Sequence, residues 1–174
     1  MSIDTIKAAL RSIPDFPKEG INFIDITPVL QDFATFSEVV ELLAERYSDM
    51  NIDCVAGIES RGFMFAAPLA LRLGCGFVPV RKAGKLPYST IAETYELEYG
   101  SATIEIHEDA VKPGAKVLLV DDLLATGGTV SAALKLFERL GAKITGVEFV
   151  VELDFLKGRK KLGAYPVNSL VVLK

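Results

Sequence analysis

Apolar residues follow two patterns along this chain, and together these predict helices and buried strands in alternation. Apolar residues that recur every three or four positions indicate one face of a helix. Short continuous apolar runs indicate strands buried on both faces. Helices are predicted at residues 3–12, about 62–73 and about 129–140, and a further helix is predicted to follow a capping box formed by Thr35 and Glu38. Strands are predicted at 54–58, 77–80, 116–120, 144–151 and 169–173, and a loop at 20–25. This order predicts an α/β fold with a central, mainly parallel sheet flanked by helices.

Residues 84–108 depart from this alternation. Polar and apolar residues alternate singly across 94–106 and turn at Gly100 and Ser101, which is typical of a β-hairpin. Few of these residues could join a core. The segment is therefore either an exposed hairpin with ordinary surface glutamates or a flexible lid that closes over a reactive ligand and excludes water.

Length and composition limit the alternatives. A chain of 174 residues, 50% apolar, fits one domain spanning 1–174. The net charge of −4 argues against nucleic acid as a partner. Two cysteines without a Cys-x-x-Cys pair suggest a reduced compartment, and a single histidine excludes zinc sites that need several. Residues 1–15 lack a signal-peptide core, and no apolar stretch reaches the ~20 residues that span a bilayer, so a cytoplasmic location without membrane contact is expected.

The strongest chemical signal lies at residues 117–129. A short apolar strand is followed by two adjacent carboxylates, Asp121 and Asp122, and then by a small turn that opens a helix. Backbone N–H groups of such a turn, with the helix N-terminus behind them, can close around a phosphate. The carboxylates would repel that phosphate, so they suit neighbouring hydroxyls or a divalent metal. An ordinary strand-to-helix turn would explain the glycines but not the paired carboxylates and threonines. The segment therefore points to a ribose 5-phosphate ligand.

Two further predicted strands end in cations. The strand ending at Ile58 leads into Ser60, Arg61 and Gly62, which form either a second anion site or a capped helix with a surface arginine. The strand ending at Val80 leads into a cluster of cations at residues 81–85. Ligands of parallel sheets bind at the carboxyl ends of the strands, so these segments are expected to converge. By contrast, the basic run at 157–161 has no strand-end context or aromatic interleaving, and it is predicted to be a solvated helix face.

The segment at 117–129 resembles the signature of the type I phosphoribosyltransferases, which bind 5-phosphoribosyl-1-pyrophosphate (PRPP). Several other segments are similar to those of the adenine-specific members of that family. They are residues 14–17, 26–28, 59–63, 81–87, 95–100, 151–153 and 156–159, so the resemblance covers nearly the whole chain.

The resemblance implies a role for each matching residue. PRPP or AMP would be bound by Asp121, Asp122, Ala125, Thr126, Gly127, Gly128, Thr129, Ser60, Lys82, Lys85 and Tyr99. Catalysis would depend on Glu98, Arg61 and Arg81, and adenine would lie between Phe23 and Leu153 with the backbone of Asn22 and Ile24 reading its edge. Many family members have arginine at the position of Ile24. The base-binding segment would span about 1–34 as a small hood, and the lid about 84–108.

The reaction implied is transfer of the 5-phosphoribosyl group from PRPP to adenine, giving AMP and pyrophosphate. Glu98 would act as general acid/base at adenine N7, Tyr99 would help close the lid, and Mg²⁺ would be held mainly through PRPP rather than by a dedicated protein site. Arg81 would come from a partner subunit, which implies a homodimer. Two alternatives stay open: the same chemistry on another purine base such as guanine or xanthine, and a PRPP-sensing regulator without activity. The short acidic chain and the intact Leu-Glu-Tyr-Gly segment at 97–100 favour catalysis over the regulator.

Overall fold

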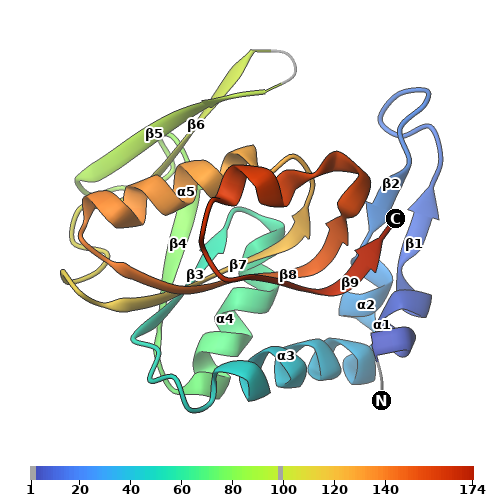
Figure 1. Cartoon of the computed structure of the whole chain (residues 1–174), viewed down its shortest axis with the longest axis horizontal. Coiled ribbons are helices and arrows are strands. Elements are labelled where there is room, and N and C mark those ends of the chain that lie inside the picture. Colours follow the sequence, from blue (N-terminus) through green and yellow to red (C-terminus); the bar gives the residue numbers. More distant parts are fainter. Residues whose placement is uncertain (1–2, 98–99) are drawn as a thin grey trace.

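The central element of the fold is a parallel sheet extended at one edge by an antiparallel hairpin (Figure 1). The computed structural model describes residues 3–97 and 100–174. Within them, the main sheet has the strand order β5-β6-β4-β3-β7-β8-β9. The parallel strands are β3 (Cys54–Ile58), β4 (Gly76–Lys82), β7 (Lys116–Leu124), β8 (Lys143–Leu153) and β9 (Val167–Leu173). The predicted α/β fold with a mainly parallel sheet is confirmed.

Helices cover both faces of this sheet. One face carries α3 (Phe33–Tyr47) and α4 (Arg61–Leu73), and the other carries α5 (Gly128–Arg139) (Figure 1). Successive residues of the central strands point to opposite faces, so Val55 and Leu118 belong to the α3/α4 core while Ala56 and Leu119 belong to the α5 core. Burial on both faces explains why these strands are continuous apolar runs in the sequence.

The N-terminal segment differs from the sequence prediction. Helix α1 (Ile3–Ala9) ends earlier than expected, and the chain then forms β1 (Arg11–Ile13), which pairs antiparallel with β2 (Phe23–Asp25). The loop expected at 20–25 is thus partly a strand, because pairing between the two short strands satisfies backbone groups that neither could satisfy alone. A short helix, α2 (Thr27–Gln31), follows.

The predicted capping box at Thr35 and Glu38 is wrong. Helix α3 begins at Phe33, and its cap is Asp32, whose carboxylate accepts the Thr35 N–H at 2.9 Å. Thr35 instead lies inside the first turn, where its hydroxyl donates to the Val29 carbonyl at 3.1 Å. An aspartate at the N-cap satisfies a free N–H group of the first turn in the same way that threonine would.

The hairpin is confirmed, but its isolation from the core is not. Strands β5 (Thr90–Glu96) and β6 (Ser101–His107) pair antiparallel, and β6 also pairs with β4. Ile104 and Ile106 are buried in the core beneath α5. The base of the hairpin is therefore part of the sheet, and its far end projects beyond α5 (Figure 1).

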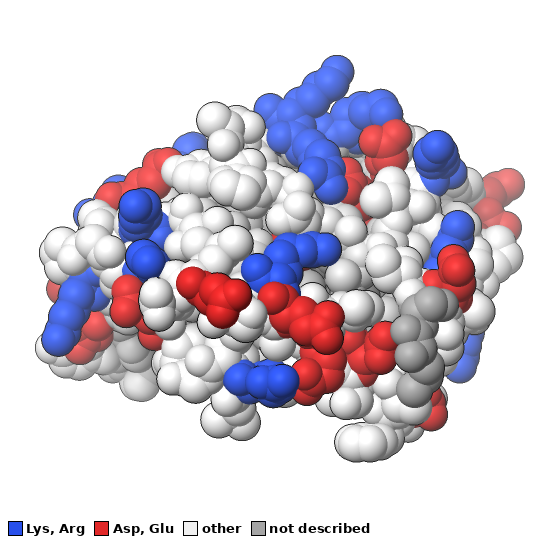
Figure 2. Space-filling model, turned by 60° about the horizontal axis from the view of Figure 1, so that its bottom comes forward, with Lys and Arg blue, Asp and Glu red and all other residues white. Residues whose placement is uncertain are grey.

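Two 3₁₀ helices, η1 (Asp154–Leu156) and η2 (Gly158–Leu162), connect β8 to β9. None of the helices in the described ranges is both long and apolar enough to cross a bilayer. The face drawn in Figure 2 carries acidic and basic side chains interspersed, with uncharged areas between them.

Candidate active site

The predicted phosphate turn forms a small cup at the carboxyl end of β7. Residues 123–130, together with Asp121, line a cavity of about 80 Å³. Gly127 is the N-cap of α5 and has a left-handed φ of 78°. A Cβ on Gly127 would also lie 2.6 Å from the Gly158 carbonyl oxygen, so only glycine fits here. The structure brings Ala125, Thr126, Gly127, Gly128 and Thr129 together around this cup.

The acidic pair lies inside β7 rather than beyond its end. The strand was expected to stop at Val120, but pairing with β8 continues it to Leu124. Asp122 is buried, and its Oδ2 lies 3.0 Å from Arg61 Nε. Burial raises the pKa of Asp122 although Arg61 opposes the shift. Burial and then the neighbouring Asp122 raise the pKa of Asp121 well above its usual range. The site therefore holds two crowded carboxyl groups that a cation or a hydroxyl donor would stabilise.

Arg61 links the acidic pair to the N-terminal segment. It is the first residue of α4, and its Cζ lies 5.5 Å from the centre of the Phe23 ring. Arg61 lines both a cavity of about 400 Å³ beside the acidic pair and one of about 350 Å³ beside Phe23. Arg61 therefore forms part of the wall of both cavities. The peptide bond between Glu59 and Ser60 is cis.

Gly62 allows α4 to approach β7 closely. A Cβ on Gly62 would lie 2.8 Å from Asp121 Oδ1 and 3.0 Å from the Val120 carbonyl oxygen. The second predicted anion site, at Ser60 to Gly62, thus lies directly against the acidic pair. Ser60 is the N-cap residue of α4 but makes no side-chain cap hydrogen bond, and Arg61 pairs with buried Asp122 instead of standing free on the surface.

The cation cluster at the end of β4, residues 81–85, is only partly directed into the site. Lys82 lines the 400 Å³ cavity with Ser60 and Asp122. Arg81 instead pairs with Glu59, at 3.1 Å from Nε to Oε2, and donates to the Lys85 carbonyl at 3.2 Å. Burial alone would raise the pKa of Glu59, but hydrogen bonds from Arg81 and the Lys82 N–H outweigh it and lower the pKa. Neither Arg81 nor Lys85 is among the residues that line this cavity.

The residues expected to bind the base are divided between surface and core. Phe23 lines the 350 Å³ cavity and contacts the Phe16 ring edge-on, with ring centres 5.2 Å apart. The Asn22 side chain accepts from the Ser12 hydroxyl at 2.6 Å. Ile24 and Leu153 both belong to the α3/α4 core, and neither lines the described cavities near Arg61. The Ile24 side chain is therefore packed in the core and does not line the cavity beside Phe23.

Tyr95 was not predicted as a site residue. It lines the 400 Å³ cavity, and its hydroxyl accepts a hydrogen bond from Thr129 at 3.0 Å. The alternating polar and apolar pattern of the hairpin predicts that Tyr95 lies on a strand. It does not show that this strand packs against α5, which is why Tyr95 was not predicted. Glu98 and Tyr99 lie outside the described residues.

The basic run at 157–161 is not simply a solvated helix face. Gly158 is buried against the phosphate turn, and Arg159 pairs with Glu152, with 2.6 Å between Nη2 and Oε2. Lys160 and Lys161 are exposed, as predicted. The sequence pattern did not reveal that one cation of the run pairs with a buried carboxylate seven residues earlier, on β8.

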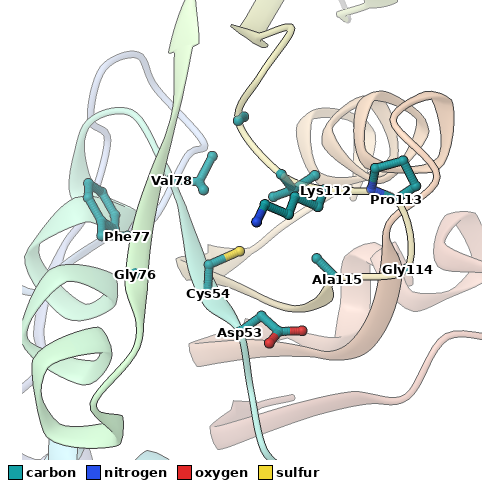
Figure 3. A pocket seen from close by; sticks show the side chains of 11 residues that line it. Asp53, Cys54, Gly76, Phe77, Val78, Lys112, Pro113, Gly114 and Ala115 are labelled. Atoms are coloured by element: carbon teal, nitrogen blue, oxygen red, sulfur yellow. The ribbon is translucent and has the colours of Figure 1, made fainter.

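A further cavity, of about 510 Å³, lies at the opposite edge of the sheet (Figure 3). The Cys54 thiol and the Lys112 amine point into it, and Asp53 beside it accepts the Lys116 N–H at 2.7 Å. Burial, followed by the effects of Cys75 and Asp53, raises the pKa of Cys54 to about 11. A thiol protonated at neutral pH is a poor nucleophile, and the cavity lacks the phosphate-binding turn and the acidic pair. The chemistry is therefore concentrated at the carboxyl edge.

Comparison with known proteins agrees with this geometry. The family model of the phosphoribosyl transferase domain matches residues 28–172. The adenine phosphoribosyltransferase of Caldanaerobacter subterraneus subsp. tengcongensis is 56% identical over 171 residues, which cover 98% of this chain and 99% of that protein. The crystal structure of adenine phosphoribosyltransferase from Thermoanaerobacter pseudethanolicus has a TM-score of 0.95 and 53% identity, covering 99% of this chain and 100% of that one. The Saccharomyces cerevisiae enzyme, solved with an imino-altritol bisphosphate and adenine, has a TM-score of 0.92 and 47% identity, covering 97% of each chain.

Proposed function

The chain belongs to the phosphoribosyltransferase family, and from this membership we propose that it transfers the 5-phosphoribosyl group of PRPP to adenine. The bond between ribose C1 and pyrophosphate breaks, a bond from C1 to adenine forms, and the products are AMP and pyrophosphate. This reaction salvages a purine base as a nucleotide. The curated relatives that cover nearly the whole chain carry this activity in their names.

One observation carries the proposal: a phosphate cup, an acidic pair and an arginine lie together at the carboxyl edge of the sheet. The cup suits the 5-phosphate, because backbone N–H groups and a helix N-terminus favour an anion. Asp121 and Asp122 suit the ribose hydroxyls between the two phosphate ends. Arg61, Lys82 and the backbone of Ser60 suit the pyrophosphate, whose departure they would assist by neutralising its charge.

The N-terminal segment, about 1–34, is the part we assign to the base. An aromatic ring such as Phe23 offers a stacking surface for a purine, and it lies next to Arg61 in the 350 Å³ cavity. The backbone of Asn22 and Ile24 would read the edge of the base. Leu153 lies in the core in this structure, so a direct contact with adenine would need a shift at the end of β8.

The hairpin at about 84–108 is the part we assign to protection from water. Displacement at C1 passes through positive charge on the sugar, which the nearby carboxylates of Asp121 and Asp122 would stabilise. Glu98 is proposed as the general acid/base at adenine N7, and Tyr99 as a contact that closes the site. Both would be delivered by the end of the hairpin.

Magnesium is proposed to be held mainly through PRPP, with the acidic pair beside it. Within residues 3–97 and 100–174, no group of three or more His, Cys, Asp or Glu side chains is arranged to hold a metal ion. Burial raises the pKa of both Asp121 and Asp122 although Arg61 opposes the shift, so a further cation beside them would be favourable, and they are the residues that would face Mg²⁺. When bound, Mg²⁺ would neutralise the pyrophosphate and orient the ribose hydroxyls.

A homodimer is part of the proposal because of Arg81. In its own chain this side chain is paired with Glu59 and does not line the cavity, which fits a role in the site of a partner subunit. Apolar side chains on the neighbouring surface of α4 and β4, such as Leu71 and Phe77, are exposed and offer a surface for a second copy. A cytoplasmic location is also proposed, because both cysteines are free thiols.

A panel of bases tests the proposal. The protein is incubated with PRPP, Mg²⁺ and adenine, guanine, hypoxanthine or xanthine, and nucleotide and pyrophosphate are measured. We expect AMP and pyrophosphate from adenine and at most slow reaction of the other bases. Preference for another base would replace adenine as the substrate. PRPP binding without release of pyrophosphate from any base would leave the sensor function instead.

A further inference from the structure

An ion pair between a buried carboxylate, Glu152, and a half-exposed arginine, Arg159, lies behind the phosphate cup. The Glu152 side chain, near the end of β8, is 4% exposed, and it accepts from Arg159 Nε and Nη2 at 2.6 Å each. The Ser169 hydroxyl donates to the same carboxylate at 2.6 Å, and Arg159 Nη1 donates to the Val167 carbonyl at 2.5 Å. A bidentate pair of arginine and carboxylate fixes orientation as well as distance. Arg159 therefore holds η2 firmly against β8 and β9.

The residue before Arg159 touches the cup directly. A Cβ on Gly158 would overlap the Ala125 carbonyl oxygen, and a Cβ on Gly127 would lie 2.6 Å from the Gly158 carbonyl oxygen. Backbone thus meets backbone here, with no side chain between that could adapt to a shift. Movement of Gly158 would be transmitted to the turn at Ala125 to Gly127.

Neither member of the ion pair lines the cavities at the carboxyl edge. The pair is therefore placed to act on the site through the shape of the cup, and not by contact with a ligand in these two cavities. The hydrogen bond from Arg159, opposed by burial, lowers the pKa of Glu152, so the pair is charged at neutral pH.

We propose that the Glu152–Arg159 pair positions the 5-phosphate turn by pressing Gly158 against it. The inference rests on the proposed function, since that function assigns the phosphate of PRPP to the turn. Loosening the pair would weaken binding of the phosphate in the ground state and the transition state alike. Such a change raises the KM for PRPP and leaves kcat nearly unchanged. The KM for adenine would not change, because the base is assigned to a different segment.

The test uses Arg159→Gln and Arg159→Lys, with Lys160→Gln as the matched control. Lys160 is the next residue, equally basic and exposed, so its loss reports the effect of charge alone. We expect Arg159→Gln to raise the KM for PRPP by roughly 10- to 100-fold, as for other groups that orient a binding element. Arg159→Lys should give an intermediate value, since lysine keeps the charge but not the bidentate geometry. Lys160→Gln should match the unsubstituted protein.

Each outcome decides the inference. If Arg159→Gln does not fold, Arg159→Lys carries the comparison, because a single hydrogen bond to Glu152 remains. A KM for PRPP in that variant equal to that of Lys160→Gln would overturn the positioning role. If the KM for PRPP and the KM for adenine rose equally in the Arg159 variants, the structure would be loosened generally, and this result would also overturn the positioning role. Absence of AMP formation by the unsubstituted protein would count against the proposed function, which separates the two failures.

Discussion

Among the residues that the structure describes, Arg61 is the one that lines both cavities of the site. It pairs with buried Asp122 at 3.0 Å and lies over the Phe23 ring at 5.5 Å. A flat guanidinium suits both contacts, because it can pair at its edge and stack on its face. In the proposed function, Arg61 would hold pyrophosphate and form part of the wall between the sugar and the base.

Replacement of Arg61 should impair the reaction strongly. For Arg61→Gln we expect kcat/KM for PRPP to fall by roughly 10²–10³-fold, the range for losing one preorganised electrostatic contact. Arg72→Gln is the matched control, because Arg72 lies on the same helix and its pair with Glu41 is exposed. Steady-state kinetics on both variants gives the answer. Equal kcat/KM values would remove Arg61 from the site.

Glu98 carries the proposed proton transfer. Glu98→Ala should lower kcat by about 10²–10⁴-fold, the usual contribution of general acid–base catalysis. PRPP binding, followed by calorimetry, should persist, because the phosphate cup is elsewhere. Glu108→Ala, at an exposed position just beyond β6, is the control and should retain full turnover. If kcat is unchanged in Glu98→Ala while PRPP still binds, Glu98 is not the acid/base.

At the scale of elements, the close approach of α4 to β7 makes the site compact. The helix can approach because Gly62 has no side chain, and a Cβ there would collide with Asp121 and the Val120 carbonyl. The contact places Arg61 beside the acidic pair. Helix position and site chemistry are therefore determined by the same residue.

In Gly62→Ala the added methyl group should push α4 away from β7. We expect a loss of about 1–3 kcal/mol of folding free energy, as for other overpacked sites, together with weaker PRPP binding. Gly76→Ala is the control: its Cβ would meet only ordinary contacts, 3.7 Å from Cys54 Cβ, and should change stability by about 0.5 kcal/mol or less. Urea denaturation measures both. Comparable stability of the two variants would contradict the proposed contact.

The elements that the sequence predicts well are those whose pattern is set locally. Continuous apolar runs gave the central strands, and Gly74 correctly marked the end of α4. The pair β1–β2 was missed because it depends on pairing between segments that show no alternation. The role of Arg159 was missed for a similar reason, since its partner Glu152 is buried on a strand and nothing in the basic run reveals it. The hairpin was predicted, but the burial of Ile104 and Ile106 was not, because it depends on packing against α5.

At the scale of the whole molecule, chemistry is gathered at one edge of the sheet. Parallel strands bring Ser60, Lys82 and Asp122 to that edge from three separate segments, as the strand-end rule predicts. The rule could not show that Arg81 would turn toward Glu59 or that Leu153 would lie in the core. Those placements depend on side-chain packing between segments that are distant in the sequence.

Complementation tests whether Arg81 acts across a dimer. Arg81→Ala and Glu98→Ala should each be nearly inactive alone. Co-expressed, they should form mixed dimers in which one site has both residues intact, so about a quarter of all sites would be active. Activity is compared with dimer content from analytical ultracentrifugation. Mixed dimers without recovered activity would mean that Arg81 serves its own chain.

The central claim is that the carboxyl edge of the sheet holds the phosphoribosyl group. A crystal structure of the protein with AMP tests it most directly. We predict the 5-phosphate within the turn at residues 125–129, the ribose hydroxyls beside Asp121 and Asp122, and adenine next to Phe23. AMP bound in the cavity beside Cys54, or anywhere else away from the turn, would contradict the claim.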